Sequence, residues 1–158
     1  MMSEAAPSAA PRATLHASAV LVGASAVLIR GPSGSGKSRL VLGLIAAAQS
    51  GRLAFARLVS DDRTELAAAH GRLVARPPEK LAGLLEIRGL GLRRLDYEPR
   101  AVVGLVVDLA AEDGDRLPDA ASRTVEIDGV RLPRLPVSAG EDPLPLVLGA
   151  LTSPDAVT

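Results

Sequence analysis

Short apolar runs, separated by glycine, proline and charged residues, follow one another along most of this chain. Runs rich in Val, Leu and Ala that end at such residues predict β-strands. They cover residues 14–22, 26–30, 53–60, 64–70, 72–76, 101–109 and 123–135, and a further strand in the stretch 85–91 is followed by two glycines. Two α-helices and one helical turn are predicted at residues 38–48, 144–151 and 79–84. Strands interspersed with a few helices indicate an α/β domain.

Two hairpins are predicted by their turns. Residues 64–70 and 72–76 are joined by Gly71, a connection that favours a hairpin over a crossover helix. Within residues 123–135, Asp128 and Gly129 form a strong signal for a two-residue turn. Both pairs of strands are therefore expected to run antiparallel.

The composition fits one folded, soluble domain. A chain of 158 residues with 47% apolar residues can bury one core but is short for two. We expect a single domain over residues 14–152, a disordered tail at 1–13 and a frayed tail at 153–158. No apolar run approaches the length of a membrane span. Balanced charge, 18 basic against 18 acidic residues, argues against a nucleic-acid or membrane surface, and the absence of cysteine is compatible with the cytoplasm.

The stretch GPSGSGKS at 31–38 matches the phosphate-binding loop G-x-x-x-x-G-K-[ST] at every fixed position. Its glycines allow successive backbone N–H groups to point inward at a polyphosphate, and the helix that follows adds its positive end. The predicted nucleotide-binding residues are Gly31, Pro32, Ser33, Gly34, Ser35, Gly36, Lys37 and Ser38. The alternative, a glycine-rich turn that binds nothing, is disfavoured because a predicted strand precedes the loop and a helix follows it.

Four further residues carry candidate chemistry. Asp61 and Asp62 end a predicted strand, where open α/β sheets bind ligands, and one of two neighbouring carboxylates can serve as a proton acceptor. Asp-Asp is also common in turns. Glu86 lies in an apolar strand, where it either meets a metal held by Ser38 or faces water at a sheet edge. His16, on the first strand, is by itself more often structural than catalytic.

Several motifs occur in the order and spacing of one family. The chain resembles the catalytic domain of HPr kinase/phosphorylase, a bacterial enzyme that acts on a serine of the phosphocarrier protein HPr. It is most similar to the short alphaproteobacterial forms linked to the nitrogen-type phosphotransferase system. The resemblance implies a P-loop domain with a mixed sheet, similar to phosphoenolpyruvate carboxykinase. It covers residues 14–140 and rests on His16, GPSGSGKS at 31–38, LVSDD at 58–62, LEIRGLGL at 85–92 and DRL at 115–117.

The resemblance also implies cofactors and partners. ATP and Mg²⁺ would be the cofactors, with Lys37 and the loop amides on the ATP phosphates, and Ser38 and Glu86 on the metal. HPr or an HPr-like phosphocarrier protein would be the partner. Family members assemble into hexamers through this domain, so a homo-oligomer is expected as well.

Catalytic roles follow from the same resemblance. One of Asp61 and Asp62, with Asp62 favoured, would take the proton from the substrate serine and return it in the reverse reaction. His16 and Arg116 would assist at the transferring phosphoryl group, because phosphoryl transfer depends mainly on positioning and on stabilisation of the phosphate oxygens.

One segment departs from the family. Near the C-terminus the family carries VRPGRN, associated with phosphate removal from phosphoserine-HPr, whereas residues 137–142 read VSAGED. An acid cannot hold phosphate as the fork of an arginine does. The sequence therefore predicts that kinase activity is retained and that phosphorolysis is weakened or supported by another arginine. The alternatives are a small-molecule or carboxykinase-like enzyme of the same fold, and a module that senses ATP without transferring phosphate.

Overall fold

The computed structural model describes residues 13–114 and 119–154 of the chain. Residues 1–12 and 155–158, which make up most of the tails expected at 1–13 and 153–158, lie outside these ranges, as does the predicted catalytic residue Arg116. Among the described residues, no helix combines the length and the apolar character that crossing a bilayer requires.

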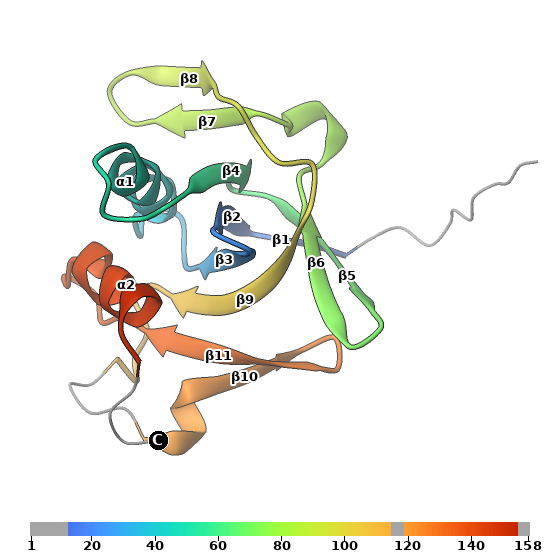
Figure 1. Ribbon diagram of the computed structural model, residues 1–158, viewed down its shortest axis with the longest axis vertical. Coiled ribbons are helices and arrows are strands. Elements are labelled where there is room, and N and C mark those ends of the chain that lie inside the picture. Colours follow the sequence, from blue (N-terminus) through green and yellow to red (C-terminus); the bar gives the residue numbers. More distant parts are fainter. Residues whose placement is uncertain (1–12, 115–118, 155–158) are drawn as a thin grey trace, which may run out of the picture.

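A mixed β-sheet forms the centre of the molecule (Figure 1). Its spatial order is β1-β5-β6-β9-β3-β2-β4, with β11 paired to β9 and β10 paired to β11. Its strands are β1 (Ala13–Leu15), β2 (Ala17–Val22), β3 (Ser25–Arg30), β4 (Ala56–Ser60), β5 (Thr64–Ala69), β6 (Arg72–Arg76), β9 (Ala101–Asp108), β10 (Thr124–Ile127) and β11 (Val130–Pro136). A separate two-stranded sheet is formed by β7 (Leu84–Ile87) and β8 (Gly91–Arg94).

The strand directions gather several strand ends at one edge of the sheet. β3 runs parallel to β9, and β9 runs parallel to β11. β2 is antiparallel to both β3 and β4, so β4 runs in the same direction as β3. The carboxyl ends of β3, β4, β9 and β11 therefore lie on the same side as the start of β2. This arrangement confirms the predicted mixed sheet and brings the loops after these strands together.

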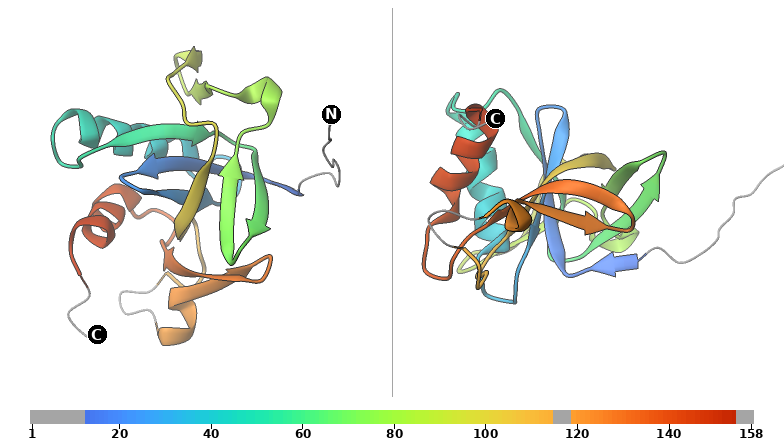
Figure 2. Two further views of the ribbon diagram at one scale, coloured as in Figure 1. Left: turned by 45° about the vertical axis from the view of Figure 1, so that its right-hand side comes forward. Right: turned by 90° about the horizontal axis from the view of Figure 1, so that it is seen from below.

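Apolar layers cover both faces of the sheet (Figure 2). α1 (Lys37–Gln49) and α2 (Pro143–Thr152) lie on one face. On the other side the sheet curls, so that its own β5–β6 and β10–β11 hairpins enclose the second apolar layer. β3 contributes to both layers, because Val27 and Ile29 pack with the helices and Leu28 packs with the opposite layer. All three side chains are at most 1% exposed. A strand buried on both faces fixes the position of the loop that follows it.

Most predicted elements are confirmed, including both hairpins and both helices, and the differences occur where the chain bends. The strand predicted at 14–22 is interrupted at His16, between β1 and β2. The strand predicted at 53–60 begins only at Ala56, because the residues before it belong to the end of α1. There the N–H groups of Arg52 and Leu53 donate to the Ala47 carbonyl. The predicted helical turn is a short 3-10 helix, η1 (Glu79–Leu81).

The strand predicted within the stretch 85–91 is confirmed as β7, but the hairpin that it begins was not predicted. β7 ends at Ile87, and a turn returns the chain as β8. Gly89 has a φ of 84°, a left-handed conformation that glycine adopts readily. The Leu90 N–H donates to the Ile87 carbonyl at 2.9 Å and closes the turn. Glu86 therefore belongs to a hairpin that stands beside α1 and β4 (Figure 1).

Candidate active site

The phosphate loop connects the buried strand β3 to α1 at the edge where the strand ends meet. Gly36, which precedes α1, has a φ of 104°, in the left-handed region that favours glycine. No side chain caps this end of α1, and its first turn contains no acidic residue. The N–H groups of the first turn are therefore not claimed by a side-chain cap, and the positive end of the helix is not neutralised. Both features suit an anion.

The interior of the loop is polar and closely packed. Lys37 is only 5% exposed, and its ammonium group donates to the carbonyls of Gly31 at 2.9 Å and Pro32 at 3.2 Å. The Ser35 hydroxyl is buried without a hydrogen-bond partner. A Cβ at Gly31 would lie 2.6 Å from that hydroxyl, so the position requires glycine. A buried hydroxyl without a partner is costly, and an oxyanion in the loop would provide one.

Asp61 links the phosphate loop to the strand beside it. It follows β4 and is 8% exposed. Its Oδ1 accepts hydrogen bonds from the hydroxyls of Ser38 at 2.6 Å and Ser18 at 2.9 Å, while its Oδ2 accepts one from the Glu86 N–H at 3.2 Å. Three donors from three different elements therefore hold this carboxylate in place.

Asp62 has a different environment from its neighbour. Its side chain is 59% exposed and lies 2.7 Å from Nε2 of His16, whose side chain is 39% exposed. Its backbone has a φ of 68°, which is uncommon for a residue other than glycine but tolerated by Asp, and its N–H donates to the Ser18 hydroxyl at 3.0 Å. The left-handed turn at Asp62 lets two consecutive acids occupy a buried and an exposed position.

The oxygen atoms around Ser38 fit a magnesium ion. Mg²⁺ prefers hard oxygen ligands and is usually held by one or two carboxylates together with phosphate oxygens and waters. Ser38 supplies a hydroxyl, and Asp61 supplies a carboxylate that contacts this hydroxyl. Glu86 supplies an exposed carboxylate, and its backbone N–H donates to Asp61. The described residues contain no group of three or more acidic, His or Cys ligands, so a metal here would need ligands from its substrate.

A cavity of about 330 Å³ opens beside the phosphate loop. One wall is formed by the loop itself and the other by the chain after β9 and between β11 and α2. Its lining residues are Pro32, Ser33, Gly34, Ser35, Leu109, Ala110, Val137, Ser138, Ala139, Gly140, Glu141 and Pro143. The segment in which the sequence departs from the family thus borders the phosphate loop.

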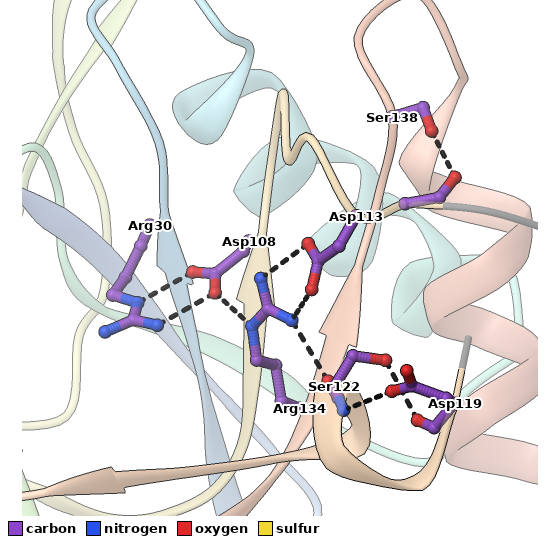
Figure 3. A network of polar contacts seen from close by, with 8 residues as sticks. Arg30, Asp108, Asp113, Asp119, Ser122, Arg134 and Ser138 are labelled. Atoms are coloured by element: carbon purple, nitrogen blue, oxygen red, sulfur yellow. Dashed lines mark hydrogen bonds and ion pairs between the residues drawn. The ribbon is translucent and has the colours of Figure 1, made fainter.

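A network of charged residues supports the walls of this cavity (Figure 3). Arg30, directly before the loop, donates to both oxygens of Asp108 at 2.7 and 2.8 Å. Arg134 donates to Asp108 at 2.5 Å, to Asp113 at 2.7 and 3.0 Å and to the Ser122 carbonyl at 3.0 Å. The network ties the ends of β3, β9 and β11 together.

The opposite charges in this network shift the pKa values of Asp108, Asp113 and Arg134. Burial alone would raise the pKa of Asp108, but the hydrogen bonds and positive charges of Arg30 and Arg134 outweigh it and lower that pKa. Hydrogen bonds from Arg134 also lower the pKa of Asp113. The pKa of Arg134 is raised, chiefly by its bond to Asp113 and also by Asp108. All of these groups are therefore charged at neutral pH.

The structure brings most of the predicted site residues to one place. His16, Asp61 and Asp62 are connected through Ser18 and through direct contacts, and Asp61 reaches Ser38. Glu86 joins them through its backbone N–H, and its carboxylate has no hydrogen bond or ion pair with another described residue. Arg116 lies outside the described residues. Sequence reasoning missed Ser18, whose only signal is its place two residues after His16 on the same predicted strand.

Comparison with known proteins gives consistent matches. The model of the family described as HPr Serine kinase C-terminal domain matches residues 8–151. HPr kinase/phosphorylase from Streptococcus thermophilus is 34% identical over 146 residues, covering 84% of this chain and 45% of that protein. HPr kinase/phosphorylase from Clostridium tetani is 32% identical over 145 residues, with the same coverage of 84% and 45%. The chain thus spans less than half the length of these relatives.

A solved structure is also similar. The Hpr(Ser) kinase/phosphatase from Coxiella burnetii has 26% sequence identity and a TM-score of 0.70, covering 89% of this chain and 93% of that one. The similarity therefore extends over most of the chain.

Proposed function

This chain belongs to the HPr serine kinase C-terminal domain family, and from that premise we propose that it transfers the γ-phosphoryl group of ATP to a serine of HPr. The proposed catalytic domain covers residues 14–152. In the reaction, the serine oxygen bonds the γ-phosphorus, the bond from that phosphorus to the bridging oxygen of ADP breaks, and the serine proton passes to a carboxylate. One observation carries the proposal: Ser38 of the phosphate loop contacts Asp61, and the next residue, Asp62, contacts His16.

The phosphate loop is proposed to hold the ATP phosphates. Lys37 would exchange its two carbonyl bonds for phosphate oxygens, and Ser35 would gain the partner that its buried hydroxyl lacks. The uncapped start of α1 supports the same role, since backbone N–H groups and the helix dipole both favour an anion there. We propose Ser38 and Glu86 as ligands of Mg²⁺, with Asp61 in contact with both residues. When bound, the metal would neutralise charge on the phosphates.

Asp62 is proposed as the general base. The oxygens of Asp61 already accept three hydrogen bonds, so that carboxylate is occupied in holding Ser18, Ser38 and the Glu86 backbone. Asp62 is exposed, and among the described residues its side chain bonds His16 through one oxygen, so that the other oxygen can receive a proton. His16 would orient Asp62 and stabilise the transferring group, and Arg116 would add positive charge there.

The forward reaction is proposed to dominate over phosphorolysis. The relatives are named kinase/phosphorylase, and the same groups can serve in both directions. However, none of the described residues that line the cavity beside the phosphate loop is basic, and Glu141 adds an acid to it. Inorganic phosphate would therefore be held less well than by an arginine pair. Rapid pyrophosphate release from phosphoserine-HPr and phosphate would contradict this part of the proposal.

The assembly and setting of the protein are part of the same proposal. A homo-oligomer, a hexamer by family resemblance, is proposed to present several copies of the site to HPr in the cytoplasm. Neither nucleic acid nor a membrane is required by the proposed reaction. The balance of 18 basic and 18 acidic residues supports this choice.

The direct test incubates the purified chain with labelled ATP, Mg²⁺ and HPr, followed by mapping of the modified residue. We expect one phosphoserine on HPr, formed only when Mg²⁺ is present. An HPr variant in which that serine is alanine serves as the matched control and should remain unlabelled. ATP turnover that needs a small acid or alcohol and ignores HPr would instead indicate a small-molecule kinase, and tight ATP binding without transfer would indicate a sensing module.

A further inference from the structure

The β7–β8 hairpin presents an apolar and basic surface to solvent. Leu90 and Leu92 are 57% and 65% exposed, more than any other large apolar side chain in the described part of the chain. Arg88 and Arg94 on the same hairpin are exposed as well. We call Arg88, Leu90, Leu92 and Arg94 the hairpin surface. Its positive charge contrasts with the chain as a whole, whose formal net charge is zero.

The strand register places this surface next to the candidate active site. In the antiparallel pair, Glu86 lies opposite Leu92 and Leu84 lies opposite Arg94. Directly opposed residues point to the same face of a sheet, with Cβ atoms about 5 Å apart. Leu85, on the other face, is fully buried in the core beside α1. Leu92 and Arg94 therefore share the exposed face with Glu86, whose N–H donates to Asp61 in the site.

A hollow adjoins the hairpin surface at its base. Arg94 lines this open space of about 520 Å³ together with Arg57, Gly83 and Tyr97. Tyr97 is 39% exposed, and Arg57 is paired with Glu98 at 3.0 Å. The hollow shares no lining residue with the cavity beside the phosphate loop. A concave space bordered by the Tyr97 ring, Arg57 and Arg94 suits an anchoring side chain of a protein partner.

We propose that the hairpin surface docks the protein that carries the accepting serine. This inference rests on the proposed kinase function and adds where the substrate protein binds. The partner would place an apolar side chain against Leu90 and Leu92 and carboxylates against Arg88 and Arg94, because complementary charge steers association and fixes orientation. Docking there would guide the serine along the face that leads through Glu86 to Asp61 and Asp62.

The charge of the hairpin surface favours a substrate protein over a second copy of this chain. A symmetric contact between two copies brings the same patch of each together. The arginines of the hairpin surface in one copy would then lie close to those of the other copy, and like charges close together are unfavourable. An acidic and apolar partner meets no such repulsion.

The test uses the double variant Leu92→Ser, Arg94→Glu, because both residues are exposed and neither is assigned to ATP or metal binding. We expect the KM for HPr to rise about tenfold or more, which corresponds to the loss of an apolar contact and reversal of one charge at a binding surface. The kcat at saturating HPr and the Kd for ATP should stay unchanged, since the phosphate loop is untouched. Arg72→Glu, an exposed arginine at the start of β6, is the matched charge control and should leave the KM unchanged.

Direct binding and mass measurements complete the test. Fluorescence anisotropy of labelled HPr without ATP should give a Kd that rises in the double variant as the KM does. Binding that depends on the hairpin without any transfer by the wild-type chain would support docking and refute the proposed function. Transfer with the same KM in both proteins would refute docking and leave the proposed function standing. If sedimentation shows that the double variant loses its oligomeric state, the hairpin surface is a subunit contact and the proposal is wrong.

Discussion

Replacing Asp62 by asparagine separates catalysis from folding more cleanly than any other change in the site. Asn keeps the size of Asp62 and one oxygen that can remain in contact with His16 at the observed 2.7 Å. It also tolerates the left-handed backbone at this position, where φ is 68°. The substitution therefore removes the ability to accept a proton and changes little else.

The expected magnitudes follow from these contacts. The Asp62 side chain is 59% exposed, so the free energy of unfolding should change by no more than about 0.5 kcal/mol. The Kd for ATP should change little, because Lys37 and Ser38 keep their positions. Loss of a general base costs about 100- to 10,000-fold in rate, equal to about 3 to 5 kcal/mol in the activation free energy.

Single-turnover transfer from labelled ATP to HPr measures this rate, and urea unfolding measures stability. Asp128→Asn is the matched control, because Asp128 is also exposed and also has a positive φ, 51°, but lies in the β10–β11 turn. It should transfer phosphate at the wild-type rate. Full activity of Asp62→Asn would refute the assignment of the base. A large loss of stability would show that Asp62 has a structural role instead.

Three further predictions test other parts of the site. Lys37→Ala should abolish ATP-dependent labelling of HPr, because the ammonium group is the cation inside the phosphate loop; unchanged labelling would remove that assignment. In Asp61→Asn only one side-chain oxygen can accept hydrogen bonds, so the free energy of unfolding should fall by about 1–3 kcal/mol, as measured by urea unfolding. Transfer by this variant should also require a higher Mg²⁺ concentration, as measured by Mg²⁺ titration. In the folded protein the pKa of Asp108 lies below its ordinary value of 3.8, so the ion pairs of Asp108 stabilise the fold above pH 3.8. This stabilisation is lost as the pH falls through the pKa that Asp108 has in the folded protein. The stability cost of Asp108→Asn should therefore be largest above pH 3.8 and shrink as the pH falls below it. A cost that stays the same across this range would contradict the role of the ion pairs.

The sequence predicted the parts of the site that depend on local structure. The phosphate loop was recognisable because its glycines, Lys37 and Ser38 lie within one short stretch between a strand and a helix. Asp61 and Asp62 were predicted to face the same crevice because they directly follow a strand. The hairpin of β5 and β6 was predicted because Gly71 leaves no room for a helix between them.

The parts that depend on strand register could not be predicted. Ser18 contacts Asp61 because β2 pairs with β4, with Ala19 opposite Ser60, and no local pattern encodes that pairing. The Arg134 bond to Asp108 likewise requires β11 to lie parallel to β9. The β7–β8 hairpin was missed for a local reason, because its glycines were taken as the end of a strand although Gly89 forms a turn.

The central claim is that a serine can sit between the γ-phosphoryl group held by the loop and the carboxylate of Asp62. A crystal structure of the chain with Mg²⁺ and a non-hydrolysable ATP analogue measures the distance between the γ-phosphorus and the nearer Asp62 oxygen. The account predicts no more than about 6 to 7 Å, the sum of a hydrogen bond and a reactive approach of one oxygen. A separation well beyond that reach, with the Asp62 carboxylate turned away from the phosphate loop, would contradict it.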